Sequence, residues 1–241
     1  MAPKVLFIYN DPSAPEALLG DVFVEQGYDV DTFMVVPAER ADDPVMEVTF
    51  PDPTGYDVVV PLGSRWSVHD AALSRTWVGT ELQLVREAVA AGVGVLGVCF
   101  GGQLVAQALG GSVAPSPQPE VGWYQVDSAA TDFIPSGPWF EWHFDRWTLP
   151  VGAVELARTP RASQAFSLGS ALALQFHPEL DGPLLELWIR EDRDGQLQRL
   201  ELDIDEIRAQ TAAERDASVD RLRVLVAGFL DRVVAAGARQ S

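Results

Sequence analysis

The first half of the chain alternates short apolar runs with segments of helical spacing. Four runs rich in apolar and β-branched residues predict strands, at residues 4–10, 29–36, 56–61 and 93–98. Between and after them, apolar residues recur every three or four positions, which predicts helices at residues 15–26, 72–91 and 100–109. Strands that alternate with helices of this length indicate βαβ units and a parallel sheet.

The pattern changes after residue 111. Short strand-like pieces follow one another without helices between them, at residues 122–127, 154–158, 164–167 and 171–176. Prolines and tryptophans separate these pieces, so we expect antiparallel structure with loops over one end of the sheet. Helical spacing returns at residues 184–190 and 217–234, and the charged stretch between these two helices is expected to be an exposed helix or loop.

Length and composition fit a folded chain with a substantial core. The chain has 241 residues, of which 47% are apolar and 22% are charged, and this balance is unlike that of disordered proteins. We expect a main domain over residues 1–190. Residues 191–241 are expected to form a C-terminal helical extension packed on the same domain.

The charge balance excludes two classes of partner. The sequence contains 17 basic and 35 acidic residues, a formal net charge of -18. Such a surface repels phosphate, so we expect no nucleic-acid partner and no docking on anionic membranes. Residues 88–119 carry no charge, but this stretch is rich in glycine and contains Gln103 and Gln107. A buried strand, turn and helix explain it better than a membrane span.

The cysteine and histidine content bears on location and cofactors. Cys99 is the only cysteine, so no internal disulfide or cysteine-pair metal site can form, and a reducing, cytoplasmic setting is expected. The three histidines are scattered, and the only lysine, Lys4, lies outside any phosphate-binding glycine loop. We therefore expect no metal and no cofactor.

The sequence around Cys99 has the form of a nucleophile elbow. Gly97-Val98-Cys99-Phe100-Gly101 follows a predicted core strand and opens a predicted helix. The glycines allow a tight turn, and the helix N-terminus favours a thiolate. We interpret Cys99 as a nucleophile; the alternative is a buried structural cysteine beside flexible glycines.

A cysteine nucleophile needs a base, and the base needs an orienting partner. The predicted strand at residues 171–176 is followed by His177-Pro178-Glu179. His177 would therefore lie at the same edge of the sheet as Cys99, with Glu179 able to accept a hydrogen bond from its other ring nitrogen. Taken alone, this tripeptide is better explained by a capping histidine and a surface acid.

Together, the segments at residues 97–103 and 177–179 resemble the paired signatures of the class I, or triad, glutamine amidotransferases. Their separation of about 80 residues also fits that family. Three further segments support the resemblance. Residues 56–64 are similar to the family's oxyanion strand and loop, and residues 120–123 are similar to a recurrent segment after the nucleophile helix. Residues 142–145 are similar to the His-x-Asp loop of GMP synthase amidotransferase domains. The acidic helical tail is similar to that of stand-alone members. The resemblance implies a flavodoxin-like three-layer α/β sandwich with a mostly parallel central sheet and an antiparallel extension.

The resemblance also implies catalytic roles. Cys99 would attack the side-chain amide carbon of glutamine, forming a γ-glutamyl thioester and releasing ammonia. His177 would hold the proton, and Glu179 would orient His177. The backbone N–H groups of Gly63 and Phe100 would form the oxyanion hole.

Substrate-binding roles follow from the same resemblance. Gln103 would contact the bound glutamine, Ser64 would line the same pocket, and His143, Phe144 and Asp145 would recognise the amino-acid end. Two departures place the substrate in question. The family commonly has a second glycine at Ser64, and it has a glycine at Phe144, where the larger ring would narrow the pocket or adapt it to another γ-glutamyl substrate.

The expected activity is that of a cysteine-dependent, glutaminase-type amidohydrolase or amidotransferase acting on glutamine or a γ-glutamyl compound. Because the sequence contains no synthetase module, a separate synthetase or acceptor subunit is a candidate partner for the released ammonia. One alternative is a γ-glutamyl peptide or γ-glutamyl amine hydrolase or transferase. Another is a non-catalytic regulatory subunit, which would have no need of Cys99, His177 and Glu179.

Two further features have less specific explanations. Three tryptophans cluster with two phenylalanines between residues 139 and 147, and we interpret this cluster as a core or lid of the antiparallel part rather than a partner surface. His69 and Asp70 follow the predicted oxyanion loop, and a surface position is favoured over a place in the pocket.

Overall fold

One mixed sheet organises the molecule. The computed structural model describes residues 2–192 and 195–234. Within them a nine-stranded sheet runs in the order β2-β1-β3-β4-β9-β8-β7-β5-β6. The strands are β1 (Lys4–Tyr9), β2 (Asp29–Met34), β3 (Val58–Pro61), β4 (Gly94–Val98), β5 (Ser112–Ser128), β6 (Gly137–Thr148), β7 (Val154–Arg158), β8 (Ser163–Leu168) and β9 (Ala171–Leu174). The strands from β2 to β9 in this order pair in parallel, and those from β9 to β6 pair antiparallel. The expected parallel sheet with an antiparallel extension is confirmed.

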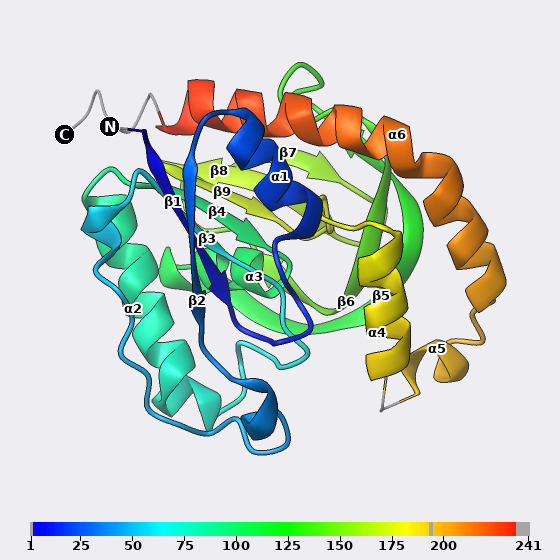
Figure 1. Ribbon diagram of the computed structural model, residues 1–241, viewed down its shortest axis with the longest axis horizontal. Coiled ribbons are helices and arrows are strands. Elements are labelled where there is room, and N and C mark those ends of the chain that lie inside the picture. The colour runs from blue at the N-terminus through cyan, green and yellow to red at the C-terminus, as the bar shows by residue number, and fades with distance from the viewer. Residues whose placement is uncertain (1, 193–194, 235–241) are drawn as a thin grey trace.

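Helices cover both faces of the parallel half (Figure 1). These helices are α1 (Ala17–Glu25), α2 (Trp77–Ala90), α3 (Phe100–Ala108) and α6 (Ile204–Phe229), whereas α4 (Gly182–Glu191) and α5 (Gln196–Arg199) pack against β5 and β6. Apolar side chains of α1 and α6 pack on one face, and those of α2 and α3 pack on the other. This arrangement confirms the three-layer α/β sandwich.

The central strands form because both of their faces are covered. Every residue of β3 and β4 is buried, and most of these residues are valines. Continuous apolar runs of β-branched residues are typical of parallel strands between two helix layers. Because β3, β4 and β9 pair in parallel, their carboxyl ends meet at one edge of the sheet. The candidate nucleophile follows β4 at this edge, and the candidate base follows β9.

The segment expected to be a loop at residues 142–145 is instead part of a strand. β6 pairs with β5 over most of its length, and Glu120 lies opposite His143. From Glu141 to Thr148, buried positions alternate with less buried ones. The buried side carries Glu141, His143 and Asp145, so the strand lacks the apolar inner face on which sequence recognition depends.

The C-terminal helix is longer than its apolar pattern predicts. α6 begins at Ile204 rather than near residue 217, after Asp203 caps its first turn through hydrogen bonds from the N–H groups of Asp205 and Glu206. Its later half buries Leu222, which packs in the core shared with α1. Among the described residues, no helix is long and apolar enough to cross a membrane.

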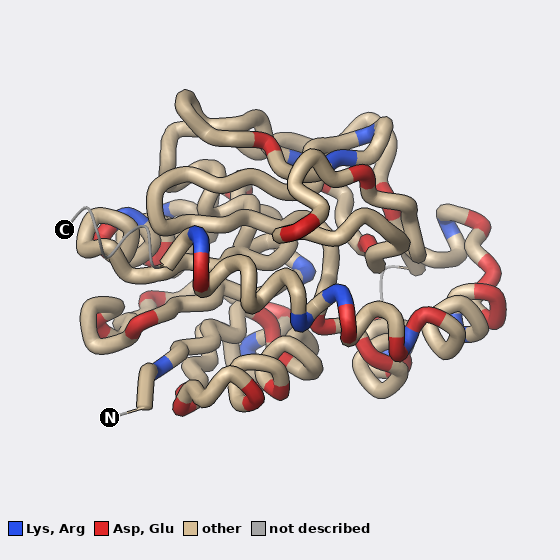
Figure 2. The backbone as a smooth tube through the Cα atoms, turned by 90° about the horizontal axis from the view of Figure 1, so that it is seen from above, with Lys and Arg blue, Asp and Glu red and all other residues tan. Residues whose placement is uncertain are grey.

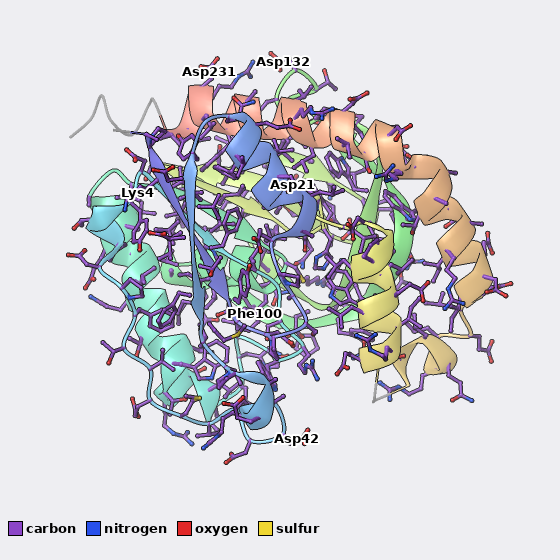
Figure 3. All side chains as sticks on the ribbon, viewed as in Figure 1. Lys4, Asp21, Asp42, Phe100, Asp132 and Asp231 are labelled. Atoms are coloured by element: carbon purple, nitrogen blue, oxygen red, sulfur yellow. The ribbon has the colours of Figure 1, made fainter. Side chains whose placement is uncertain are left out.

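The acidic residues are spread over the surface. Figure 2 shows Asp and Glu on helices and loops around the whole tube, with fewer Lys and Arg among them. In Figure 3, the labelled Asp132 and Asp231 lie at the upper edge of the molecule, and Asp21 lies on α1. Phe100 is buried at the start of α3.

Candidate active site

Cys99 lies at a strained turn between β4 and α3. Its φ of 51° and ψ of -106° place it in a region that residues other than glycine rarely adopt. Neighbouring backbone comes very close on both sides of the turn: a Cβ on Gly97 would lie 2.4 Å from the carbonyl oxygen of Gly101, and a Cβ on Gly101 would lie 1.9 Å from that of Pro61. The two glycines are thus required by close approach, and the geometry is that of a nucleophile elbow.

His177 and Glu179 reach the same sheet edge from the end of β9, which pairs with β4. The Nδ1 atom of His177 lies 2.7 Å from Oε1 of Glu179, and both side chains are almost fully buried. The backbone N–H of His177 donates to the carbonyl oxygen of Phe140 at 2.7 Å, which ties the base to β6. These contacts fix both the position and the tautomer of the imidazole.

The second ring nitrogen of His177 faces the thiol. Its Nε2 meets no nitrogen or oxygen partner within the described chain and lies beside Cys99. Burial disfavours the imidazolium, but the negative charges of Glu179 and Cys99 outweigh it, and the pKa of His177 is well above its usual value. The imidazole thus lies beside the sulfur on one side and is held by the carboxylate of Glu179 on the other.

The predicted oxyanion groups lie on either side of Cys99. Phe100 opens α3, where first-turn N–H groups have no acceptor inside the helix. Gly63 follows β3, and a Cβ placed there would lie 3.4 Å from Cε1 of His177 and 4.0 Å from Cβ of Cys99. Ser64 lines the same cavity, and its Oγ accepts the N–H of Trp66 at 3.2 Å.

The loop after Gly63 is held by a residue that the sequence interpretation missed. Asp11 accepts the backbone N–H of Arg65 at 3.1 Å and its Nε at 2.6 Å. Burial alone would raise the pKa of Asp11, but hydrogen bonds from Arg65 and Ser13 outweigh it and lower that pKa. The sequence indicated only a turn at Asn10-Asp11-Pro12, because a contact spanning 54 residues leaves no local signal.

Buried amides connect the pocket to the thiol. The Nε2 of Gln103 is 3.4 Å from the carbonyl oxygen of Asp145 and 3.4 Å from Oε1 of Gln175. The Nε2 of Gln175 in turn lies 3.8 Å from Sγ of Cys99. Gln103 lines the cavity, as expected for a substrate contact, but its amide nitrogen is already bonded within the protein. Gln175 was not identified as a site residue from the sequence.

His143 belongs to a buried cluster of carboxyl groups. Its Nδ1 lies 2.8 Å from the carbonyl oxygen of Asp145, so Nδ1 carries a proton, and its Nε2 lies 3.3 Å from Glu120 and 3.6 Å from Glu141. Glu120 also accepts hydrogen bonds from Thr159 and Gln164. Burial, followed by the charge of Glu120, raises the pKa of Glu141 well above its usual value.

Aromatic residues form one wall of a cavity of about 310 Å³ at the site. The ring of Trp188, on α4, lies 4.6 Å from the imidazole of His177, and its Nε1 donates to the carbonyl oxygen of Ser13. Trp142 and Phe144 line the same cavity, and Trp142 donates its Nε1 to Gln196 at 2.7 Å. The wall thus continues outward from His177 to α5.

The tryptophan cluster divides between core and cavity. Trp139 stacks on Phe176 with ring centroids 4.5 Å apart, and Trp147 packs edge-on against Phe166. Both tryptophans are buried, as the core interpretation predicts, whereas Trp142 faces the cavity. The half-exposed His69 places its Nε2 3.2 Å from the carboxylate of Asp145, a cavity residue.

The structure brings most of the predicted site residues to one cavity. Those lining it are Gly63, Ser64, Cys99, Phe100, Gln103, His143, Phe144, Asp145 and His177. Glu179 lies behind His177. Within residues 2–192 and 195–234, no group of three or more His, Cys, Asp or Glu side chains is arranged to hold a metal ion.

Known proteins resemble this chain in both sequence and fold. The family model described as glutamine amidotransferase class-I matches residues 67–183. The glutamine amidotransferase-like protein chyE of Penicillium rubens is 33% identical over 174 residues, which is 66% of this chain and 71% of that protein. A glutamine-hydrolyzing GMP synthase of Aeropyrum pernix is 33% identical over 156 residues, covering 61% of this chain but only 28% of the synthase.

Two further matches extend this picture. A γ-glutamyl-L-1-hydroxyisopropylamide hydrolase of a Pseudomonas species is 27% identical over 163 residues, which is 56% of this chain and 54% of the hydrolase. The crystal structure of a glutamine amidotransferase from Thermotoga maritima superimposes with a TM-score of 0.81 at 25% identity, covering 97% of this chain and 99% of that one. Sequence, fold and cavity agree, and the chain belongs to the class-I glutamine amidotransferase family.

Proposed function

We propose that this protein cleaves the γ-glutamyl amide bond of glutamine, or of a related γ-glutamyl compound, through a thioester on Cys99. The observation that carries the proposal is the alignment of three groups. Cys99 occupies the elbow, His177 faces it, and Glu179 holds the far side of His177 at 2.7 Å. This is the arrangement of nucleophile, base and orienting acid that acyl transfer requires.

The proposed reaction has two halves. The Cys99 thiol gives its proton to His177 and its sulfur attacks the side-chain amide carbon, so that a C–S bond forms and the amide oxygen gains negative charge. His177 then gives its proton to the departing nitrogen, the C–N bond breaks, and ammonia or an amine leaves. In the second half, a water molecule loses a proton to His177 and attacks the thioester. The C–S bond breaks, and glutamate is released.

The negative oxygen needs preorganised donors. We assign this role to the backbone N–H groups of Gly63 and Phe100, which flank Cys99 in the cavity. A single donor of this kind lowers the barrier by about 2.7–4 kcal/mol. The anchoring of Arg65 by Asp11 supports this role for Gly63, because it fixes the loop in the free protein.

We assign recognition of the glutamyl end to the remaining cavity residues. Gln103 lies on the first turns of α3 and Ser64 follows Gly63, while Phe144 and Asp145 are neighbouring positions of β6; all four line the cavity. His143 is mostly buried, with one ring nitrogen bonded to backbone, so its proposed contribution is to support this wall.

The fate of the nitrogen distinguishes two versions of the proposal. Ammonia could pass to a synthetase subunit, as suggested by similarity to glutamine-hydrolyzing GMP synthases. Alternatively, the leaving group could be a larger amine, as suggested by the relative named γ-glutamyl-L-1-hydroxyisopropylamide hydrolase. The outward continuation of the cavity to Trp188 and Gln196 favours the second version, because it leaves space beyond the reacting amide.

A substrate panel tests the proposal. Glutamine, γ-glutamyl peptides and γ-glutamyl amines are each assayed for release of glutamate and of ammonia or amine, with Cys99→Ala as the blank. We expect weak turnover of free glutamine and at least about tenfold faster cleavage of one larger substrate, a difference of about 1.4 kcal/mol in the barrier. Turnover of free glutamine near 10 s⁻¹, in preference to every larger substrate, would contradict the larger-substrate version. No cleavage of any member would favour the non-catalytic alternative.

A further inference from the structure

Gln175 is a fully buried amide next to the nucleophile. It follows β9, two residues before His177, and none of its surface is exposed. Its backbone N–H donates to the carbonyl oxygen of Gln164 on β8 at 2.9 Å, so the main chain is fixed. Its side chain extends to Cys99, where Nε2 lies 3.8 Å from Sγ, the separation of a long N–H···S hydrogen bond.

The neighbouring amide determines which end of Gln175 meets the sulfur. The Nε2 of Gln103 lies 3.4 Å from one terminal atom of the Gln175 amide. Because Nε2 is a hydrogen-bond donor, the Gln175 atom that faces it must be the acceptor oxygen. Gln103 has a second acceptor in the carbonyl oxygen of Asp145, which fixes the direction of its own amide. Gln175 therefore turns its oxygen to Gln103 and its NH₂ group to Cys99.

The sulfur has different partners in its two protonation states. A neutral thiol donates to the carbonyl oxygen of Trp142, at 3.8 Å. A thiolate has no proton to donate and accepts instead from the amide of Gln175, while the imidazole of His177 lies beside it. Hydrogen bonds to a charged group contribute more than those between neutral groups. The Gln175 amide consequently interacts more strongly with the thiolate than with the thiol.

We propose that Gln175 is a positioning residue for the nucleophile, whose amide, oriented by Gln103, stabilises the Cys99 thiolate and directs it away from the Trp142 carbonyl. The inference rests on the proposed function only in treating Cys99 as the nucleophile. It adds a second donor to the sulfur that is independent of His177. An amide at this position costs desolvation that an apolar residue would not, and the bond to sulfur offsets that cost.

The single cysteine gives this proposal a direct measurement. Alkylation by iodoacetamide reports Cys99 alone, because the sequence contains no other thiol. The rate is measured across pH in the absence of substrate. The charged and titratable groups around the cavity remain in place when Gln175 is substituted. They are His177, Glu179, Glu141, Glu120, His143, Asp145, Asp11, Asp42, Arg65, Glu191 and Asp192.

Two variants separate charge from packing. Gln175→Met keeps the volume and removes the donor, and we expect the pH midpoint of alkylation to rise by about one unit, which is about tenfold less thiolate at a given pH below the midpoint. Gln175→Glu keeps the shape and replaces the donor with an acid, and it should raise the midpoint further. On any accepted substrate, kcat should fall with little change in KM.

Gln164→Met is the matched control. Gln164 is equally buried, one strand away on β8, and it donates to Glu120 rather than to sulfur. It should lose comparable stability but keep the wild-type alkylation midpoint. An unchanged midpoint in folded Gln175→Met, or an equal shift in Gln164→Met, would overturn the proposal. If Gln175→Met does not fold, an unchanged midpoint in Gln175→Glu would do so.

This test is independent of substrate turnover. A protein that cleaves no γ-glutamyl substrate but shows the expected midpoint shift would contradict the proposed function and leave the Gln175 assignment in place. If Gln175→Met turns over substrate at the wild-type rate and its alkylation midpoint is unchanged, the Gln175 assignment is contradicted and the proposed function stands.

Discussion

Glu179→Gln isolates the electrostatic part of the triad. The substitution keeps an oxygen that can accept the Nδ1–H of His177, now 2.7 Å from Glu179, and removes the negative charge. Two unit charges about 4 Å apart at an effective dielectric of about 20 interact by ~4 kcal/mol. Full loss of that stabilisation from the imidazolium corresponds to a rate decrease on the order of 10³-fold. His177→Asn, which removes the proton carrier itself, should be more damaging.

Glu179→Gln should also change how the reaction rate and the stability depend on pH. Glu179 holds the pKa of His177 well above its usual value, so the variant should titrate at lower pH. The alkaline limb of kcat/KM, where the imidazolium loses its proton, should then move to lower pH. For stability, a raised pKa contributes fully below the ordinary histidine value of about 6.5 and is lost as pH rises through the folded-state value. Glu179→Gln should therefore be most destabilised, relative to wild type, at acidic to neutral pH.

Single-turnover measurement of thioester formation across pH is the appropriate assay, with circular dichroism as the check on folding. Rates within about threefold of wild type, together with an unmoved alkaline limb, would refute the assigned role of Glu179. A larger effect on thioester formation from His143→Asn than from His177→Asn would show that the wrong histidine had been assigned.

The remaining predictions concern the elbow and its anchor. Cys99→Ala should reduce γ-glutamyl cleavage by at least about 10⁴-fold in a folded protein, and kinetics within tenfold of wild type would contradict the mechanism. Gly101→Ala should lower the Tm strongly, because the new Cβ would lie 1.9 Å from the carbonyl oxygen of Pro61; a wild-type melting curve would contradict the close approach. Arg65→Ala leaves the Asp11 carboxylate, 2% exposed, without its cation. Urea unfolding should show that the free energy of unfolding falls by about 2–3 kcal/mol. This is less than the roughly 3–5 kcal/mol lost when a fully buried ion pair is broken, because Arg65 is partly exposed. An unchanged urea midpoint would contradict the anchoring role.

The parts of the fold that were predictable share a local cause. Residues of β3 and β4 are apolar at every position, and the glycines around Cys99 are required within five residues of one another. Such features are visible in sequence because the residues that form them occupy consecutive or closely spaced positions, even where the contact itself is distant, as between Gly101 and Pro61. The predicted strands and helices of the parallel half were therefore correct to within a few residues.

The parts that were missed depend on distant contacts or on an unusual environment. β6 was not recognised because its inner side carries Glu141, His143 and Asp145 instead of apolar residues. Asp11 and Gln175 act on residues 54 and 76 positions away, so no local motif marks them. The start of α6 was missed because its first turns are polar and are fixed by the cap at Asp203 rather than by an apolar stripe.

The most direct test of the account is to look for the acyl-enzyme itself. The protein is incubated with the glutamine affinity label diazo-oxo-norleucine, and separately with a cleaved panel substrate quenched in acid, and the peptide containing residues 97–103 is examined by mass spectrometry. We expect a covalent adduct on Cys99 in both experiments and none in Cys99→Ala. An unmodified Cys99 peptide from a protein that still cleaves the substrate would contradict the thioester mechanism.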